Sequence, residues 1–219
     1  MRLQVSDLTF SYGDRSLFEG VSFSLEPGQA LSIDGPSGSG KSTLCLILAG
    51  LIPRLIAGDL RGEVSYDDIP LAQMSLTQIA AAVAMVFQTP DQQLFLSTVE
   101  DELAFACENL CLPAEEIGSR IDEILDIFSL EPYRMAHPDT LSGGQRQLVT
   151  IASILMMRPH FVILDEALSQ LDENHTQRVL NVLERLKQTG TGLIIVDHRE
   201  TVHALCETHL DLEQYSCRL

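Results

Sequence analysis

The sequence has few basic residues, no tryptophan and no long apolar run. Its 219 residues include 14 Lys and Arg against 31 Asp and Glu, which gives a formal net charge of −17 at pH 7. Such a field repels the phosphates of nucleic acids and disfavours direct binding of DNA or RNA. No apolar stretch reaches the roughly 20 residues that cross a bilayer, and the first residues lack the apolar segment of a signal peptide. We therefore expect any membrane contact to come through a partner.

Cysteine usage indicates a reducing compartment. The five cysteines are scattered and odd in number, as is typical of a reduced cytosolic protein. Cys107 and Cys111 lie four apart on a predicted helix and could form a metal pair, but no His or third Cys stands near them. We favour buried small apolar residues as the interpretation of both.

Basic side chains are absent from a long internal stretch. No Lys or Arg occurs in residues 62–119, whereas acidic residues are frequent there. A solvated acidic face explains this pattern, since several of the acids also suit the first turns of helices. A docking surface for a basic partner explains it too, although charge alone favours the solvated face. The acids are Glu63, Asp67, Asp68, Asp91, Glu100, Asp101, Glu102, Glu108, Glu115 and Glu116.

Hydrophobic patterning predicts an α/β fold. Continuous apolar strands alternate with helices late in the chain, which is typical of a parallel sheet buried on both faces. A helical block, with its second helix opening at Pro113, interrupts that alternation, so we expect a separate lobe. The apolar face of that second helix is formed by Ile117, Ile121, Ile124, Leu125 and Phe128. The predicted strands are 3–5, 21–25, 30–33, 83–87, 160–164 and 193–196, and further helices are 41–50, one capped by Thr98, 142–157 and 173–188.

Residues 35–42 form a glycine-rich loop suited to phosphate. They follow the pattern G-x-x-x-x-G-K-S between a predicted strand and a predicted helix. Glycines let backbone N–H groups converge on an anion, and the helix N-terminus adds a favourable dipole. Lys41, one of only two lysines, supplies a charge for the β- and γ-phosphates, and the Ser42 hydroxyl coordinates Mg²⁺. The predicted ATP-binding residues here are Gly35, Pro36, Ser37, Gly38, Ser39, Gly40, Lys41, Ser42 and Thr43.

Two apolar strands are followed by acidic residues and a histidine. Asp165 and Glu166 end the first strand, and His198 follows the second. The carboxyl ends of strands in open α/β sheets face the ligand crevice, so these side chains should point toward bound phosphate. Asp165 would hold Mg²⁺ and Glu166 would polarise the attacking water. A lone histidine is more often structural, but its place at a strand end favours a role for His198 at the site.

A second glycine-rich loop, residues 141–145, opens its own predicted helix and can bind phosphate too. One chain has one P-loop, so the pair suggests nucleotide held between two copies of such a chain. The run Ser142-Gly143-Gly144-Gln145, between a P-loop and an Asp-Glu strand, resembles the signature of the ATP-binding cassette (ABC) ATPases. The resemblance covers nearly the whole chain. It implies two subunits paired head to tail, with ATP between one P-loop and the other subunit's signature.

The resemblance implies roles for four further residues. Gln88 matches the Q-loop glutamine, which reaches the Mg²⁺ and water region, and His198 matches the switch histidine that contacts the γ-phosphate. Asp172 matches the D-loop aspartate that helps form the dimer. Tyr12 matches the early aromatic that stacks on adenine, although a tyrosine at a strand end has the same spacing. Family members usually continue further beyond the switch histidine.

The resemblance also implies the architecture. It predicts a P-loop NTPase fold over residues 1–219 as a single ABC domain, with a mostly parallel sheet core, an antiparallel β subdomain and a helical subdomain that carries the signature. Residues 1–96 and 158–219 would form the nucleotide-binding lobe, and residues 97–157 the helical signature lobe.

A more specific likeness lies after Gln88. The runs V-F-Q-T-P-D-Q-Q-L-F at 86–95 and T-V-E-D-E-L-A-F at 98–105 look like the ATPases of energy-coupling factor (ECF) importers for cobalt or vitamins, with Thr89 in place of Asn. In those importers this region receives basic coupling helices of a transmembrane subunit. With that resemblance, docking through Asp91, Glu100 and Asp101 becomes the favoured interpretation of the acidic stretch.

The predicted function is therefore that of an ATP- and Mg²⁺-dependent ATPase subunit, peripheral on the cytoplasmic face of the cell membrane, that energises uptake of a vitamin or transition-metal ion. Its expected partners are a transmembrane coupling subunit, a substrate-binding membrane subunit and a second ABC ATPase, identical or different. The alternatives are the ATPase of another ABC transporter, a soluble cassette ATPase in DNA maintenance or translation, and a nucleotide kinase. The last two fit less well, because the net charge opposes nucleic acid and a kinase would not need the signature.

Overall fold

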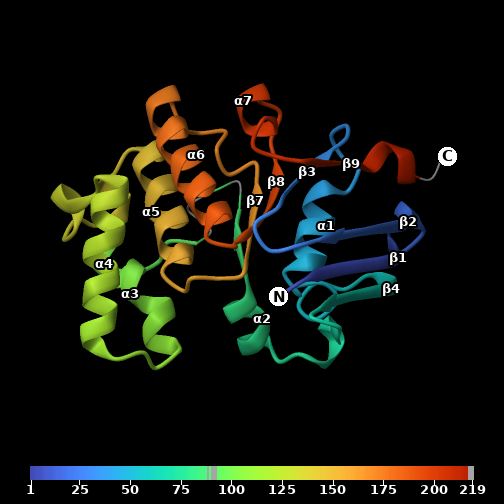
Figure 1. The fold of residues 1–219 in the computed structure, drawn as a ribbon, viewed down its shortest axis with the longest axis horizontal. Coiled ribbons are helices and arrows are strands. Elements are labelled where there is room, and N and C mark those ends of the chain that lie inside the picture. The colour runs from blue at the N-terminus through green and yellow to red at the C-terminus, as the bar shows by residue number, and fades with distance from the viewer. Residues whose placement is uncertain (88, 90–92, 217–219) are drawn as a thin grey trace.

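Two β-sheets organise the chain in a computed structural model that describes all residues except 88, 90–92 and 217–219 (Figure 1). The larger sheet has the strand order β6-β7-β8-β3-β9, and every neighbouring pair in it is parallel. The smaller has the order β2-β1-β4-β5 and is antiparallel. The strands are β1 (Leu3–Tyr12), β2 (Arg15–Leu25), β3 (Ala30–Asp34), β4 (Asp59–Tyr66), β5 (Ile69–Pro70), β6 (Val83–Val86), β7 (Phe161–Asp165), β8 (Gly192–Val196) and β9 (Thr208–Asp211).

Helices cover the parallel sheet and connect its strands. Thr98 caps α3 as predicted, because its side chain accepts a hydrogen bond from the backbone N–H of Asp101. Ser75 caps α2 in a capping box with Gln78 that the sequence analysis did not identify. The helices are α1 (Lys41–Leu48), α2 (Leu76–Ala82), α3 (Val99–Asn109), α4 (Ala114–Phe128), α5 (Gly143–Leu155), α6 (Glu173–Gln188) and α7 (Glu200–His203).

The parallel sheet is buried on both faces, as predicted. Successive side chains of a strand point to opposite faces, so β7 contributes to two cores. Val162 and Leu164 belong to a core with the helices α3 to α6. Phe161 and Ile163 belong to a second core with α1 and the antiparallel sheet. The sheet is therefore the central layer, and Figure 1 shows α1 between the two sheets and α4 to α6 beyond β7.

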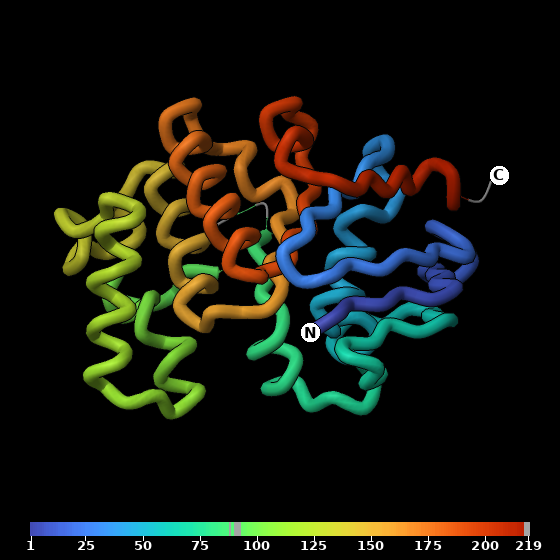
Figure 2. The backbone as a smooth tube through the Cα atoms, viewed as in Figure 1, coloured from blue at the N-terminus to red at the C-terminus, as the bar shows by residue number. Residues whose placement is uncertain are grey.

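The helical block lies on one side of that layer. Figure 2 shows the chain leaving β6, running through α3, α4 and α5, and returning as β7. All five residues of the predicted apolar face of α4 are buried, and they pack in the same core as one face of the parallel sheet. The assignment of residues 97–157 to a lobe of their own stays a prediction. No helix among the described residues combines the length and apolar character that crossing a bilayer requires.

Several expectations differ from the structure. The predicted strands 3–5 and 21–25 are the two ends of one long hairpin, β1 and β2, whose middle carries register shifts that break the alternation. Strands β4, β5 and β9 and helices α2 and α7 were not predicted, because they are short or mostly exposed. Cys107 is buried as expected, with its thiol on the carbonyl oxygen of Met156 at 3.3 Å. Cys111 is exposed just beyond the end of α3, so the burial predicted for it is wrong.

Candidate nucleotide-binding site

The loop between β3 and α1 is shaped for an anion. Gly40 precedes α1 with a φ of 100°, and no side chain caps the helix, which leaves its first N–H groups for a ligand. The positive φ of Gly40 favours glycine, and a Cβ there would be tight, 3.0 Å from the ring of Phe18. Lys41 is only 7% exposed, and its Nζ donates to the carbonyl oxygens of Gly35 at 2.7 Å and Pro36 at 3.1 Å. The lysine is therefore folded back over the loop.

A pocket of about 510 Å³ opens beside this loop. It brings together side chains from the β1–β2 hairpin, the loop, the start of α1 and the ends of β7 and β8, which are distant in sequence. Of the predicted residues, Gly35, Pro36 and Ser39 belong to the loop but do not line the pocket. The lining residues are Tyr12, Arg15, Leu17, Ser37, Gly38, Gly40, Lys41, Ser42, Thr43, Glu166 and His198.

Asp165 ends β7 next to the start of α1 and is 6% exposed. Burial raises the pKa of its carboxyl group, the hydrogen bond from Ser42 lowers it in part, and the charge of Glu166 raises it further. Its Oδ1 atom is buried and has no hydrogen-bond partner among the described residues. A buried carboxylate oxygen without a partner is costly unless something binds it, and beside the Ser42 hydroxyl it suits a hard divalent cation.

Glu166 leaves the strand at an unusual angle. Its φ of 49° lies in the left-handed region, which costs of order 1–3 kcal/mol for a residue other than glycine. The backbone N–H of Glu166 donates to the carbonyl oxygen of Val196 at 2.9 Å, so the turn is tied to β8. Its side chain lines the pocket together with His198. Strain of this kind collects at functional sites, where surrounding contacts hold it.

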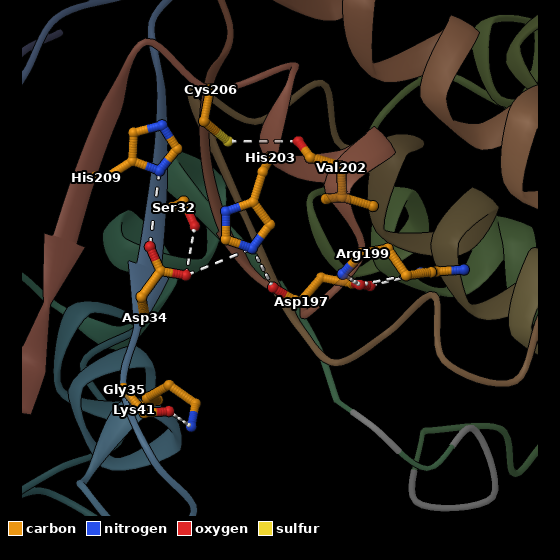
Figure 3. Close-up of polar contacts among 10 residues, drawn as sticks. All are labelled: Ser32, Asp34, Gly35, Lys41, Asp197, Arg199, Val202, His203, Cys206 and His209. Atoms are coloured by element: carbon orange, nitrogen blue, oxygen red, sulfur yellow. Dashed lines mark hydrogen bonds and ion pairs between the residues drawn. The ribbon is translucent and has the colours of Figure 1, made fainter.

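His198 lies between two residues that form a charged fork. The Arg199 side chain donates to both carboxylate oxygens of Asp197, from Nε at 2.9 Å and from a terminal nitrogen at 2.6 Å (Figure 3). Burial opposes the charge of Asp197, but the hydrogen bonds of Arg199 outweigh it and lower the pKa of the carboxyl group. The other terminal nitrogen of Arg199 donates to the Thr176 hydroxyl on α6 at 3.0 Å. The fork fixes the segment that presents His198 to the pocket.

The loop at residues 142–145 lies away from the P-loop pocket and lines none of it. Ser142 caps α5 in a capping box: its Oγ accepts from the Gln145 N–H at 3.3 Å, and the Gln145 side chain accepts from the Ser142 N–H at 2.9 Å. A Cβ on Gly144 would meet the ring of His175, just past the predicted D-loop. Within one chain, the two glycine-rich loops therefore do not share a ligand.

Asp172 caps α6 and Gln88 lies outside the described residues. The Asp172 carboxylate accepts from the backbone N–H of His175 at 2.8 Å and contacts its Nδ1 at 2.9 Å. The backbone hydrogen bond from His175 is the main cause of the lowered pKa of Asp172. The dimer role predicted for Asp172 and the metal role predicted for Gln88 stay predictions.

Arg15 and Leu17 line the pocket but were missed from the sequence. Gly13 and Asp14 turn the β1–β2 hairpin, which pairs Tyr12 with Arg15 across it. The Arg15 guanidinium would lie 3.7 Å from a Cβ on Gly38, so it stands beside the phosphate loop. The short Gly-Asp turn after an aromatic strand end is a signal that could have found this arginine.

Known proteins are similar to this chain in sequence and in fold. Residues 18–169 match the family described as ABC transporter. The chain belongs to this family. A putative ABC transporter ATP-binding protein of Pyrococcus horikoshii is 41% identical over 90% of this chain and 70% of its own length. The energy-coupling factor transporter ATP-binding protein EcfA1 of Leuconostoc mesenteroides is 36% identical over 89% of this chain and 70% of its own.

A solved structure has the same fold. CbiO1 from Clostridium perfringens, described as part of the ABC transporter complex CbiONQ, has a TM-score of 0.82 and 28% identity, covering 95% of this chain and 83% of that one. The predicted fold class, an ABC cassette with a parallel sheet, an antiparallel sheet and helices, is confirmed. The protein is the ATP-binding subunit of an ABC transporter and an ATPase.

Proposed function

We propose that this ABC ATPase energises an ECF-type importer of a micronutrient, a vitamin or a transition-metal ion. Two similarities support the proposal: EcfA1 is named an energy-coupling factor ATP-binding protein, and CbiO1 is part of a CbiONQ complex. Such a subunit would bind at the cytoplasmic face of the membrane and act together with a transmembrane coupling subunit and a substrate-binding subunit. The ATPase of another ABC transporter is the second candidate.

One observation carries the mechanism: the loop at residues 142–145 lies outside the pocket that holds the P-loop, Glu166 and His198. A second ABC ATPase, identical or different, would supply its own signature loop, equivalent to residues 142–145, to the γ-phosphate. The capped N-terminus of α5 then presents two glycines and the helix dipole to the anion. Gln170, Leu171 and His175, which flank Asp172, lie against the glycines of this loop, so Asp172 would help shape the same interface. Closure would follow ATP binding.

The pocket residues divide the chemistry between them. Tyr12, 38% exposed and edge-on to Phe10 at 4.7 Å, offers a ring to the adenine. Lys41 would exchange its two loop carbonyls for phosphate oxygens. Glu166 would orient and polarise the attacking water, and His198, which lines the same pocket, would contact the γ-phosphate.

Ser42 and Asp165 would hold Mg²⁺. The unpartnered Oδ1 of Asp165 and the nearby hydroxyl fit this hard cation. When bound, Mg²⁺ neutralises charge that develops on the phosphates. Gln88, the third predicted ligand, lies outside the described residues.

The surface for the transmembrane subunit is better supported by aromatic residues than by acids. Of the three predicted docking acids, Asp91 lies outside the described residues. Glu100 pairs with Arg134, and Asp101 accepts from the Thr98 hydroxyl at 2.6 Å, so these two acids already have partners within the chain. Phe95 and Phe105 form an edge-to-face pair 5.0 Å apart and remain 66% and 40% exposed. An exposed aromatic pair of this kind is typical of a protein interface.

A buried carboxylate holds this aromatic pair in place. Glu102 is 4% exposed and accepts hydrogen bonds from the backbone N–H groups of Phe95 and Leu96. Burial raises the pKa of Glu102, and those two hydrogen bonds lower it in part. The segment that presents Phe95 is therefore fixed to α3, which gives a coupling helix a rigid surface to dock on.

The substitution Glu166→Gln tests the catalytic assignment. The amide keeps the shape but cannot act as a base, so we expect ATP hydrolysis to fall at least about 100-fold. The affinity for ATP, measured by titration with a fluorescent analogue, should stay within twofold of that of the unaltered chain. With ATP present, the variant should elute as a trapped dimer in size-exclusion chromatography. Glu63→Gln, an exposed change on β4, is the matched control. Normal hydrolysis by Glu166→Gln would remove Glu166 from this role.

The importer class needs a separate test. Co-expression with the membrane proteins encoded beside this chain should yield a complex that contains a transmembrane coupling subunit and a small substrate-binding subunit. A complex with a different transmembrane architecture would favour another ABC transporter and overturn the ECF assignment.

A further inference from the structure

Three side chains with metal-ligand chemistry converge behind the nucleotide pocket. Asp34 ends β3, His203 ends α7 and His209 lies on β9, so three elements contribute one residue each. One ligand atom from each residue lies within 4.8 Å of the others. Figure 3 shows both imidazoles beside the Asp34 carboxylate, each next to a different one of its oxygens. None of the three lines the pocket described above.

The separations approach those of a metal site. The Asp34 Oδ2 atom lies 3.6 Å from Nδ1 of His209, and the ring of His203 lies against the same carboxylate, with its Nε2 edge 3.4 Å from Oδ1. Zinc bonds of about 2.0–2.1 Å in a tetrahedron place neighbouring ligand atoms roughly 3.3 Å apart. The histidine rings are nearly parallel, at 8°, with centroids 5.7 Å apart. Small side-chain movements would bring three ligand atoms onto one ion.

The surrounding hydrogen bonds orient the ligands. Nε2 of His203 lies 2.7 Å from the carbonyl oxygen of Asp197, which can only accept, so this nitrogen carries the proton. The other nitrogen, Nδ1, then keeps the lone pair that a metal ion requires. The Ser32 hydroxyl donates to Oδ1 of Asp34 at 3.1 Å, which leaves Oδ2 toward His209. A ring N–H held by a carbonyl is the usual support of a metal-binding histidine.

The ligand set selects the class of ion. Two imidazoles and one carboxylate suit borderline ions such as Zn²⁺, Co²⁺ and Ni²⁺, whereas Mg²⁺ and Ca²⁺ prefer oxygen alone. Asp34 and His203 are each 29% exposed and His209 is 49% exposed, so an ion can enter and water can complete its coordination. We propose that Asp34, His203 and His209 form a binding site for a divalent transition-metal ion of this class.

The position of the site gives it a further consequence. Asp34 directly precedes Gly35 of the phosphate loop, and the Asp197 carbonyl that holds His203 directly precedes His198. An ion here would link β3, which leads into the P-loop, with α7, which follows His198, and with β9. The proposal concerns this chain's own ion site and does not depend on which substrate the transporter carries.

Binding of the metal alone tests the site. The full chain, with millimolar Mg²⁺ present to occupy the Ser42–Asp165 region, is titrated with Co²⁺ and followed by its visible absorption, and with Zn²⁺ by calorimetry. We expect one ion per chain, absorption bands of four- or five-coordinate Co²⁺, and a higher melting temperature with metal, because an ion that binds only the folded state stabilises it.

The variants His203→Gln and His209→Gln should each weaken metal binding at least tenfold and abolish the thermal shift. His160→Gln, which removes an exposed histidine elsewhere, is the control and should bind as the unaltered chain does. Because His209 is half exposed, its variant should fold even if changes at Asp34 or His203 do not. Equal affinity in His209→Gln and His160→Gln, or no metal-induced shift in the unaltered chain, would show that the cluster is a hydrogen-bonded support only and would overturn the proposal.

Discussion

Replacing Arg199 by Met should destabilise the fold and isolate what the charged fork beside His198 contributes. The Asp197 side chain is 5% exposed and accepts three hydrogen bonds from residue 199. Two come from the guanidinium, at 2.9 and 2.6 Å, and one comes from the backbone N–H at 2.9 Å. Methionine keeps the apolar stem and the backbone donor but removes both charged donors, so the buried carboxylate keeps only backbone donors, from residues 198 and 199.

The magnitude follows from those contacts. Each hydrogen bond to a charged group contributes about 1.5 kcal/mol or somewhat more, so losing two costs about 3 kcal/mol. The Arg199 side chain is 33% exposed, which allows water to replace part of what is lost. We therefore expect Arg199→Met to lower the free energy of unfolding by about 2 kcal/mol. Asp197→Asn alone leaves the guanidinium facing a neutral amide and should cost less.

A double-mutant cycle measures the coupling. Urea unfolding of Arg199→Met, Asp197→Asn and the double variant should give an interaction energy of about 1–2 kcal/mol. Arg185→Met, a change at an exposed position of α6, is the control and should stay within about 0.5 kcal/mol of the unaltered chain. A coupling energy near zero would refute the view that the fork is a buried, charge-assisted contact.

The remaining predictions concern pH and partner binding. The pKa of Asp197 is lowered in the folded state, so its ionised carboxylate contributes fully to stability above the unfolded-state pKa of about 3.9. That contribution is lost as the pH falls through the folded-state pKa. In urea unfolding, the difference in stability between the unaltered chain and Arg199→Met should therefore narrow below about pH 4. A gap that widens toward acid would contradict this sign. Changing Phe95 and Phe105 together to Ser should reduce co-purification with the transmembrane subunit at least tenfold while basal ATPase activity stays within twofold, whereas Ile69→Ser, a change at an exposed apolar residue on β5, should alter neither.

Local patterns predicted the site's loops and the central sheet well. The P-loop, the Asp165-Glu166 strand end and the apolar face of α4 each depend on neighbours in sequence, and each lies where the sequence places it. Patterns of this kind are informative because helix and strand periods are short. Thr98 is a further case, since a capping hydrogen bond spans only three residues.

Features that depend on long-range pairing could not be predicted in the same way. The long β1–β2 hairpin was recognised only at its ends, because bulges interrupt its alternation. Arg15 faces the phosphate loop through a register set by that hairpin. The cluster of Asp34, His203 and His209 joins residues up to 175 positions apart, and β9 pairs with β3 only in the folded sheet. No short window of sequence contains that information.

The charge composition argued against nucleic-acid-binding classes of protein, but it was misleading about which acidic side chains are free to dock a partner. A stretch without basic residues suggested a surface of free carboxylates, yet three of its acids, Glu100, Asp101 and Glu102, are engaged within the chain. An exposed acid with an internal partner contributes less to docking than its charge suggests, because the partner must be given up or shared. The aromatic pair Phe95 and Phe105, held by Glu102, has no such cost.

The hydrogen bonds at the site also indicate what nucleotide binding has to change. Ser142 is already engaged in its capping box, and the Asp197 fork is already closed, so both groups have hydrogen-bond partners before nucleotide binds. Lys41 is different, because its Nζ donates to two carbonyl oxygens of its own loop. In the proposed complex phosphate would replace those partners, close to the Oδ1 atom of Asp165, which has no hydrogen-bond partner within the described part of the chain. Within one chain, the side chains around the site are therefore already held by hydrogen bonds, and the rearrangement expected on nucleotide binding is concentrated at Lys41.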